Sequence, residues 1–247
     1  MKLLRYIFFT VICTIAATTL YAQNKNFVDM KEFDDNSFKD AMPTVIKDSS
    51  ILFQHLIGIK YGYSINGIAF NQQIRTKSIE NPINFGIYYT YLHSLWESMP
   101  YFGFQTGLEY TSFGSKVLFG DEDSPDQTEI EYYYNSYVLP ITVQFRTDIK
   151  MMRLMVNAGS YAYNICSEYN GKEVPATTNL YGCGLTAGGG VAVKLHPIEL
   201  HLECTYRYSL SNFFNPKIYS ETYWTYAHST QLQFSVGLFY NFTRKKK

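Results

Sequence analysis

The chain of 247 residues is long enough for one large hydrophobic core or two smaller ones. Its 21 basic and 21 acidic residues cancel, which excludes the strong positive field of a nucleic-acid-binding protein, and charged residues make up only 17% of the chain. Aromatic residues also make up 17%, a composition suited to surfaces that are apolar on one side and wet on the other, such as membrane interfaces.

The N-terminus has the pattern of an export signal. Lys2 and Arg5 precede the apolar run YIFFTVICTIAATTL, and the small residue Ala22 follows shortly after it. A basic start, a short apolar stretch and a small residue predict a cleaved secretory signal peptide over residues 1–22. Residues 23–52 are polar and charged without a clear period, and we expect a flexible periplasmic leader there.

Alternation of apolar and polar residues begins at about Gln54, as in strands whose successive side chains point to opposite faces. No segment after the signal approaches the roughly 20 consecutive apolar residues of a membrane helix. The alternating segments are residues 57–66, 83–91, 102–110, 136–146, 153–165, 181–195, 198–210 and 231–242. The fifth is ambiguous, because two sets compete for its apolar face: Leu154, Val156 and Ala158, or Met155, Tyr161 and Tyr163.

Eight segments of about ten to thirteen residues match the strand length and even strand number of a small outer-membrane barrel. The connections after the second, fourth and sixth segments are short, and the other connections are longer and polar. The turn KLHPIE supports a single register. Pairing Leu195 with Ile198 also pairs Lys194 with Glu199, and it keeps each pair on one face of the sheet.

The two faces of these segments distinguish a soluble sandwich from a membrane barrel. One face is dominated by Gly, Ser, Thr, Asn and Gln with charges of both signs, whereas the polar face of a sandwich would carry many loose Lys and Glu. The other face is apolar and essentially uncharged, as lipid contact demands. We therefore predict an all-β fold, an antiparallel up-and-down transmembrane β-barrel of about eight strands over residues 53–243, with a basic tail at 244–247.

Four stretches carry a family resemblance: GLEYTSFG, YVLPITVQF, LMVNAGSYAYNI and GGGVAVKLHPIELHLECTYRYSLSNFF. Together they resemble the outer-membrane β-barrel domain family of Bacteroidetes that includes PorT-like proteins. The late Arg-Tyr-x-Leu strand end of that family is matched at Arg207, Tyr208 and Leu210. The resemblance implies a barrel in a Gram-negative outer membrane without catalytic residues, and for one branch it implies a link to protein secretion. The closing strand LQFSVGLFYNF resembles those that barrel-assembly machinery recognises.

Charged residues on the polar face are candidates for an interior network. An eight-stranded interior is just wide enough for side chains to fill it, which favours a paired polar plug. The alternative is a narrow ion or proton path in which His201 titrates near neutral pH. The lumen candidates are Lys60, Glu109, Arg146, Lys194, Glu199, His201, Glu203 and Arg207.

The other patterns in the sequence do not predict a catalytic, metal or cofactor site. The glycine stripe within residues 182–190 lacks the Lys-Ser/Thr of a phosphate cradle, and we expect it to make room for inward rings such as Tyr88 or Phe239. His93-Ser94 and His228-Ser229 have no evident orienting carboxylate for nucleophilic catalysis. We expect no cofactor and no enzymatic activity.

Two external segments are candidates for contact with other molecules. FGDEDSPDQTEIEYYY clusters acidic residues without EF-hand spacing, which leaves open a solvated loop or a weak divalent-cation bridge to lipopolysaccharide. SNFFNPKIYSETYWTYAHS is rich in ring types found at interaction hot spots, and an aromatic girdle is its alternative role. The candidate partner-binding residues of this second segment are Phe213, Phe214, Tyr219, Tyr223 and Trp224.

We therefore expect a non-enzymatic protein of the outer membrane with a polar plugged lumen and surface loops for interaction or assembly, supporting envelope integrity or protein secretion. The expected partners are outer-membrane lipid and lipopolysaccharide, the barrel-assembly machinery during biogenesis, and an envelope or secretion protein. A narrow ion or small-solute channel and a lipid-modifying outer-membrane enzyme are the alternatives.

Overall fold

The computed structural model describes residues 53–70, 74–94, 101–119, 128–149, 151–215 and 226–243. Within these ranges no helix is long and apolar enough to cross a membrane. Eight strands make up most of the described chain: β1 (Phe53–Phe70), β2 (Arg75–Ser94), β3 (Tyr101–Phe119), β4 (Thr128–Ile149), β5 (Met152–Glu168), β6 (Tyr181–Leu195), β7 (Ile198–Ser209) and β8 (Ala227–Asn241).

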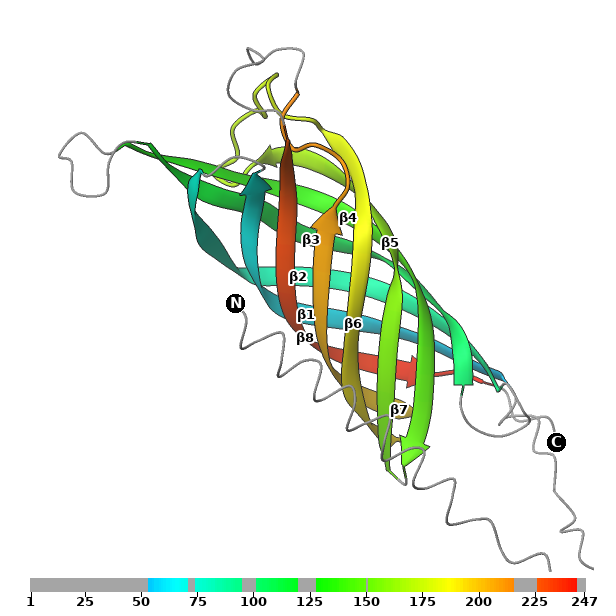
Figure 1. Cartoon of the computed structure of the whole chain (residues 1–247). Helices are drawn as coiled ribbons and strands as arrows, with labels where there is room; N and C mark the ends of the chain where they lie inside the picture. The colour runs from blue at the N-terminus through cyan, green and yellow to red at the C-terminus, as the bar shows by residue number, and fades with distance from the viewer. Residues whose placement is uncertain are drawn as a thin grey trace, which may run out of the picture. The chain divides into compact units, whose positions relative to one another are not determined.

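The strands form one closed barrel in which each strand pairs antiparallel with its neighbours in the sequence. The seam that closes the ring joins β8 to β1, from Leu56 opposite Asn241 to Phe70 opposite Ala227. Figure 1 shows the strands following one another around the barrel, from blue β1 to red β8. The predicted all-β barrel of eight antiparallel strands with up-and-down topology is confirmed.

Six strands, β1 to β5 and β8, are longer than the alternation predicted, whereas β6 and β7 match their predicted bounds to within one residue. β7 has 12 residues but β4 has 22, and only residues 71–74 separate β1 from β2, so the expectation of a long first connection is wrong. A register shift between β1 and β2 explains why the alternation underestimated these two strands. On β2, Asn84 lies opposite Gly62 but Asn81 lies opposite Ser64, and the extra residue changes the phase that a strict two-residue pattern follows.

The register predicted at the sixth turn is confirmed, because Leu195 pairs with Ile198 and Lys194 pairs with Glu199. This two-residue turn and the one at residues 150–151 lie at the end of the barrel where β1 begins and β8 ends. β5 and β7 end, and β6 and β8 begin, at the opposite end of the barrel, where the intervening stretches of sequence are longer. Short turns face the periplasm in outer-membrane barrels, so the two ends are called periplasmic and external.

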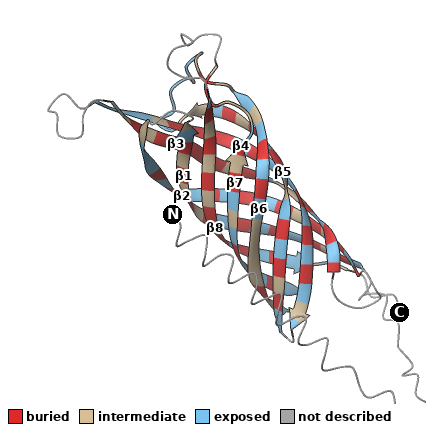
Figure 2. Ribbon diagram, viewed as in Figure 1, coloured by how far each residue is buried: buried red, intermediate tan, exposed pale blue. Residues whose placement is uncertain are grey.

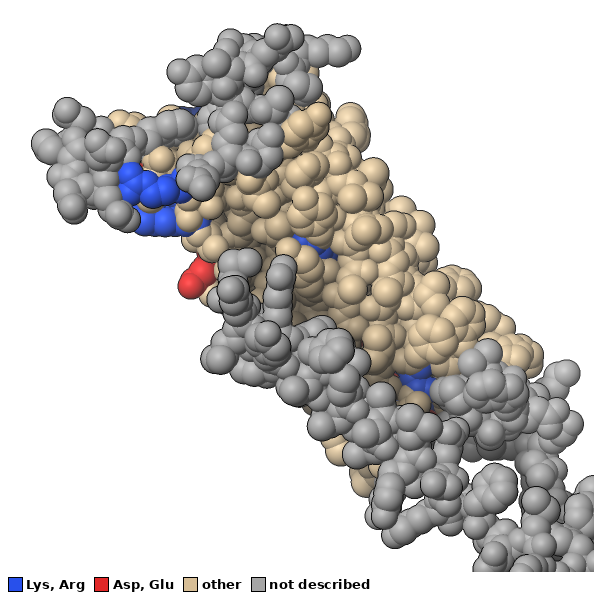
Figure 3. All heavy atoms as spheres, viewed as in Figure 1, with Lys and Arg blue, Asp and Glu red and all other residues tan. Residues whose placement is uncertain are grey.

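Burial alternates along the strands, as the red and pale blue bands of Figure 2 show. On β1, Ile57 and Ile59 point outward and are about half exposed, whereas the alternate residues Gly58 and Lys60 are buried. Outward positions in the central part of the described strands carry no charged side chain. Figure 3 shows the broad uncharged surface that results on one face of the barrel. This surface is suited to contact with lipid chains.

β5 has the phase that the sequence left open. Met155, Tyr161 and Tyr163 are buried in the lumen, whereas Val156 and Ala158 point outward. Apolar side chains therefore lie on both faces of β5, since the lumen is aromatic where this strand nears the external end.

Candidate functional site

The barrel lumen contains most of the charged residues singled out by the sequence, and β7 supplies a row of them. Its strand geometry points every second side chain inward, so Glu199, His201 and Glu203 follow one another along the lumen. The imidazole of His201 lies between the two carboxylates, with Nε2 3.1 Å from Glu199 Oε2 and Nδ1 3.4 Å from Glu203 Oε1. Its ring stacks on Phe239 at a centroid distance of 4.2 Å.

Two ion pairs cross the middle of the lumen. Lys60 Nζ lies 2.6 Å from Glu203 Oε2 and donates to Gln105 Oε1 at 2.9 Å. Arg207 binds Glu109 in a bidentate manner, with Nη1–Oε1 and Nη2–Oε2 distances of 2.9 and 2.8 Å. All four charged side chains are almost completely buried, so each charge depends on its partner rather than on water.

The Arg207–Glu109 pair is held in place by neutral side chains. Glu109 also accepts hydrogen bonds from the Tyr88 hydroxyl and, at 3.0 Å, from Gln233 Nε2. Arg207 Nη1 donates to Gln231 Oε1 at 2.9 Å. The pair is therefore the centre of a network that satisfies several buried polar groups together.

A second charged group lies toward the periplasmic end. Arg153 binds Asp148 through Nε at 2.6 Å and Glu199 through Nη1 at 2.9 Å, and its Nη2 donates to Gln54 Oε1 at 3.0 Å. Lys194 Nζ donates to Asp148 Oδ2 at 2.7 Å. These residues come from β1, β4, β5, β6 and β7, so the group ties most of the barrel wall together at this end.

Arg146 has the weakest contacts of the buried cations. Its Nε and Nη2 donate to Gln144 Oε1 at 3.1 and 2.7 Å, but Nη1 has no hydrogen-bond partner and lies 3.8 Å from Glu199 Oε2. The guanidinium is fully buried.

Seven of the eight lumen residues named from the sequence are buried side by side in this interior. Lys194 differs, because it lies at the periplasmic opening with its side chain 27% exposed. Sequence reasoning missed Arg153 and Asp148, although they are cross-strand partners flanking the turn at residues 150–151. The charge-pair argument used for the sixth turn would have found them. The seven buried residues are Lys60, Glu109, Arg146, Glu199, His201, Glu203 and Arg207.

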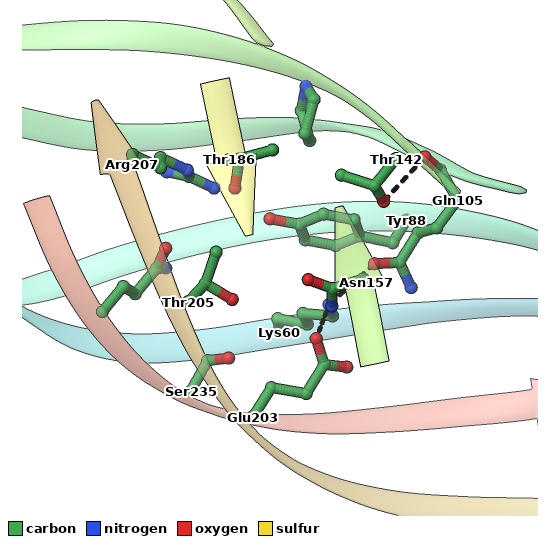
Figure 4. Close-up of a pocket in the computed structure, with 12 residues that line it drawn as sticks. Lys60, Tyr88, Gln105, Thr142, Asn157, Thr186, Glu203, Thr205, Arg207 and Ser235 are labelled. Atoms are coloured by element: carbon green, nitrogen blue, oxygen red, sulfur yellow. Dashed lines mark hydrogen bonds and ion pairs between the residues drawn. The ribbon is translucent and has the colours of Figure 1, made fainter. Parts of the chain in front are cut away.

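A small cavity of about 20 Å³ lies between the two central ion pairs (Figure 4). Its twelve lining residues come from all eight strands and include Lys60, Tyr88, Glu203 and Arg207. A space of this size holds about one water molecule. The centre of the barrel is therefore filled by side chains.

Toward the external end the lumen is filled by an aromatic cluster, here called the external cluster. Phe213 and Phe214 belong to it and are 1% and 3% exposed. Their backbone is held by the β5–β6 connection, since Asn179 N donates to Phe213 O at 3.0 Å and Thr178 bridges with Phe214. The other members are Ile68, Phe113, Tyr134, Val138, Tyr161, Tyr163, Ile165 and Ala227.

This burial corrects the interpretation of the last external segment. Phe213 and Phe214 were expected to contact a partner, but their rings pack inside the barrel, because the chain after β7 turns inward over the lumen. The other three candidates, Tyr219, Tyr223 and Trp224, lie outside the described residues.

Two glycines of β6, Gly182 and Gly184, accommodate rings, but not the rings expected. A Cβ at Gly184 would lie 2.7 Å from the ring of Tyr161, its direct cross-strand neighbour on β5. Tyr88 and Phe239 lie elsewhere, with Phe239 against Gly58 on β1. Gly182 and Gly184 thus make room for Tyr163 and Tyr161 on the adjacent strand β5, whereas Gly188, Gly189 and Gly190 meet no ring.

Beyond the lipid-facing surface, the external ends of β2, β3 and β4 carry an exposed charged cluster. Lys116 Nζ lies 2.9 Å from Glu129 Oε1, and Lys77 Nζ lies 3.6 Å from Glu129 Oε2. The hydrogen bond from Lys116 holds the pKa of the Glu129 carboxyl below its usual range, and it raises the pKa of the Lys116 ammonium. Glu129 and Glu131 of the predicted acidic loop thus lie in β4, and the remainder of that loop lies outside the described residues.

Among the residues that the structure describes, no group of three or more His, Cys, Asp or Glu side chains is arranged to hold a metal ion. Cys166, Cys183 and Cys204 are free thiols on the outer surface. In the part of the chain that the structure describes, the lumen holds a buried hydrogen-bonded ionic network.

Comparison with known proteins identifies a matching family and several similar solved structures. A family model described as "Outer membrane protein beta-barrel domain" matches residues 9–215. No curated protein matches the chain. Among solved structures, the chain is similar to OprG of Pseudomonas aeruginosa, with 10% identity, a TM-score of 0.47 and coverage of 78% of this chain and 98% of that chain.

Two further solved structures are similar at lower scores. Ail of Yersinia pestis, solved with the heparin analogue sucrose octasulfate, has 15% identity and a TM-score of 0.37, and the match covers 76% of this chain and 99% of that chain. Neisserial surface protein A has 10% identity and a TM-score of 0.38, and the match covers 74% and 96% of the two chains.

Proposed function

Because the chain belongs to the outer membrane protein beta-barrel domain family, we propose that it is a non-conducting, non-enzymatic barrel whose plugged lumen serves as a rigid support for external contacts. The observation that carries this proposal is the filling of the lumen. Ion pairs cross the barrel axis, the central cavity measures only about 20 Å³, and the external cluster lies over it.

We also propose how the protein is exported and assembled, and to which branch of the family it belongs. Residues 1–22 act as a cleaved signal peptide, residues 23–52 form a periplasmic leader, and the closing strand is recognised by the barrel-assembly machinery. The family branch is that of PorT-like proteins of Bacteroidetes, with a role in envelope integrity or protein secretion. The basis for these finer assignments is the sequence pattern and the resemblance it carries.

A non-enzymatic role is supported by the positions of the two His-Ser pairs. Neighbouring residues on a strand point to opposite faces, so neither pair can form a catalytic dyad. His93 contacts Phe53 edge to face at a centroid distance of 4.8 Å whereas Ser94 is buried, and His228 stacks on Tyr208 whereas Ser229 is buried. If the protein modified lipid, overproduction would change the mass of lipid A, and we expect no change by mass spectrometry.

The deciding experiment is conductance across a planar lipid bilayer, after a heat-dependent gel shift has shown that the refolded barrel is closed. We expect no discrete current steps, because buried side chains fill the middle of the lumen around Glu203 and Arg207 and the cavity between them holds about one water molecule. Reproducible steps that change in amplitude on Glu203→Ala would establish the channel alternative and overturn the plugged lumen.

External partner binding needs a separate test. Replacing residues 212–227 would also remove Phe213 and Phe214 from the external cluster, so the sharper variant replaces only residues 216–225 with a Gly/Ser linker. We expect this variant to fold and to lose co-purification with an envelope or secretion protein that the wild type retains after crosslinking. Equal co-purification by both proteins would move the contact away from Tyr219, Tyr223 and Trp224.

A further inference from the structure

The periplasmic end of the lumen is hollow, in contrast with its middle. A cavity of about 270 Å³, here called the vestibule, is lined by the starts or ends of β1, β4, β5, β6, β7 and β8. This volume is several times the roughly 30 Å³ that one water molecule occupies in the liquid. The lining residues are Gln54, Asp148, Arg153, Lys194, His196, Pro197, Glu199 and Asn241.

The charges of the lumen balance in the middle but not beside the vestibule. Lys60 pairs with Glu203, and Arg207 pairs with Glu109, one cation to one carboxylate in each case. At the periplasmic end, by contrast, three cations share two carboxylates, and His201 adds no negative charge in either protonation state. The three cations are Arg146, Arg153 and Lys194, and the two carboxylates are Asp148 and Glu199.

An unbalanced charge in a buried network is costly unless another group compensates it. The cation least well compensated is Arg146, which is fully buried with Nη1 unpartnered and 3.8 Å from the nearest Glu199 oxygen. Its field and that of Arg153 act on the vestibule from the lumen side. The vestibule is therefore a place where a negative group is favoured.

The hydrogen-bonding groups at the vestibule also favour a negative group. The carboxylate of Asp148 already accepts from Arg153 and Lys194, and that of Glu199 accepts from Arg153 and His201. The Lys194 ammonium has three donors and uses one of them on Asp148. Donors are thus in excess at the wall of the cavity, and the acceptors are in use.

We propose that the vestibule binds a small oxyanion group, a phosphate or a carboxylate, through the ammonium of Lys194 and the neighbouring side chains of His196 and Asn241. A divalent cation is disfavoured there by the excess positive charge, and a monatomic anion would leave most of the cavity unfilled. Two sources can supply the group: a free periplasmic anion, or the headgroup of a phospholipid. The second source is within reach because Leu195 and Ile198, next to the vestibule in the sequence, point outward to the lipid.

The test is a titration of the refolded full-length chain with inorganic phosphate in maltoside micelles, whose headgroup carries no phosphate. Sodium chloride keeps the ionic strength constant, and amide resonances of Leu195, His196 and Ile198 report binding. We expect shifts that saturate, and a dissociation constant about tenfold higher for Lys194→Gln, since one charge-assisted hydrogen bond is lost. Lys172→Gln, an exposed lysine in the β5–β6 connection, is the matched control and leaves the titration unchanged.

The outcomes separate the possibilities. Shifts that grow linearly without saturation, or that change equally in Lys194→Gln and Lys172→Gln, overturn the site. If Lys194→Gln does not give a heat-modifiable barrel, Lys194→Arg, which keeps the charge, is expected to retain saturation, and its loss there also overturns the site. Reconstitution into phosphatidylglycerol bilayers identifies the source. A lipid headgroup in the vestibule abolishes the phosphate titration, and a free anion as the ligand leaves it intact.

Discussion

Two ion pairs, each with one member on β3, differ most in where the barrel places them. Glu109 and Lys116 both belong to β3, and their partners lie at nearly the same distance, 2.8 Å for Arg207 Nη2 to Glu109 and 2.9 Å for Lys116 to Glu129. The first pair is 3% and 1% exposed in its side chains, whereas the second is 36% and 39% exposed at the external end.

This difference shows that the N–O distance does not indicate how much each pair contributes to the stability of the barrel. Water around the exposed pair competes with its hydrogen bond and screens its charges, so either partner can be lost at little cost. In the lumen a carboxylate without its guanidinium has no water to replace it, and breaking the pair is strongly destabilising. The closed barrel therefore depends on the buried pair for its stability, whereas the exposed pair contributes little to it.

The largest effect is expected from Arg207→Met, which leaves Glu109 buried without its cation. We expect the free energy of unfolding in micelles to fall by about 3–5 kcal/mol, as for other broken buried pairs. Urea titration followed by the heat-dependent gel shift measures it. Adding Glu109→Gln removes the stranded charge and should recover much of the loss. Additive losses in the double variant would mean that the two side chains do not act as a pair.

A somewhat smaller effect is expected from Phe213→Ala, which opens the external cluster above the buried pair. The ring of Tyr161 in this cluster lies over the Arg207 guanidinium at 5.8 Å. Loss of a buried Phe ring typically costs about 3 kcal/mol, and water entering the space should make the remaining stability depend on salt. Tyr226→Ala, at an exposed ring, is the control. Equal losses in both variants would show that the cluster does not shield the pair.

Crowding the same ring should have a smaller effect again. In Gly184→Ala the new methyl group would meet the ring of Tyr161 and the backbone of Tyr208, and overpacking of this kind costs about 1–3 kcal/mol. Gly189→Ala on the same strand meets only one neighbouring atom at 3.2 Å and is the matched control. Indistinguishable urea midpoints for the two variants would remove the proposed role of Gly184.

The smallest effect is expected from Lys116→Gln, which breaks the exposed pair. The pKa of Glu129 is lowered in the folded barrel, so this pair can stabilise the fold only above the usual carboxyl range, and its contribution disappears as the pH falls through the lowered pKa. We expect the urea midpoint to be unchanged within error at neutral pH and high salt, and unchanged at acidic pH as well. A large loss at neutral pH that vanishes on acidification would place this pair alongside the buried one.

The sequence predicted the barrel because lipid and lumen impose different side chains on alternate positions. Where that contrast is sharp, as on β7, both the register and the inward set follow from the pattern. It fails on β5, because the external cluster makes the lumen as apolar as the lipid face, and hydropathy cannot separate Tyr161 from Val156. Arg153 was missed for the same reason, since its inward direction depends on that phase.

Loop residues were harder to place than strand residues. A stretch such as SNFF has the composition of a surface hot spot and also of a cluster that closes a lumen. Only the backbone contacts of Phe213 and Phe214 with residues 178–179 decide between the two, and no local pattern encodes a contact between segments more than thirty residues apart. The sequence pattern did not predict the vestibule either, because this cavity forms where the ends of six strands come together.

The lumen bonds also constrain how the barrel forms. Glu109 and Arg207 are 98 residues apart, Lys60 and Glu203 are 143 apart, and Gln231 and Ser64 are 167 apart. Contacts of such long range are characteristic of slow folding, because a large loop must close before any bond repays it. A half-assembled sheet would present these charges to the lipid unpaired. We therefore expect insertion, ring closure and ordering of the interior to occur as one cooperative step. The pairing of β8 with β1 completes this step.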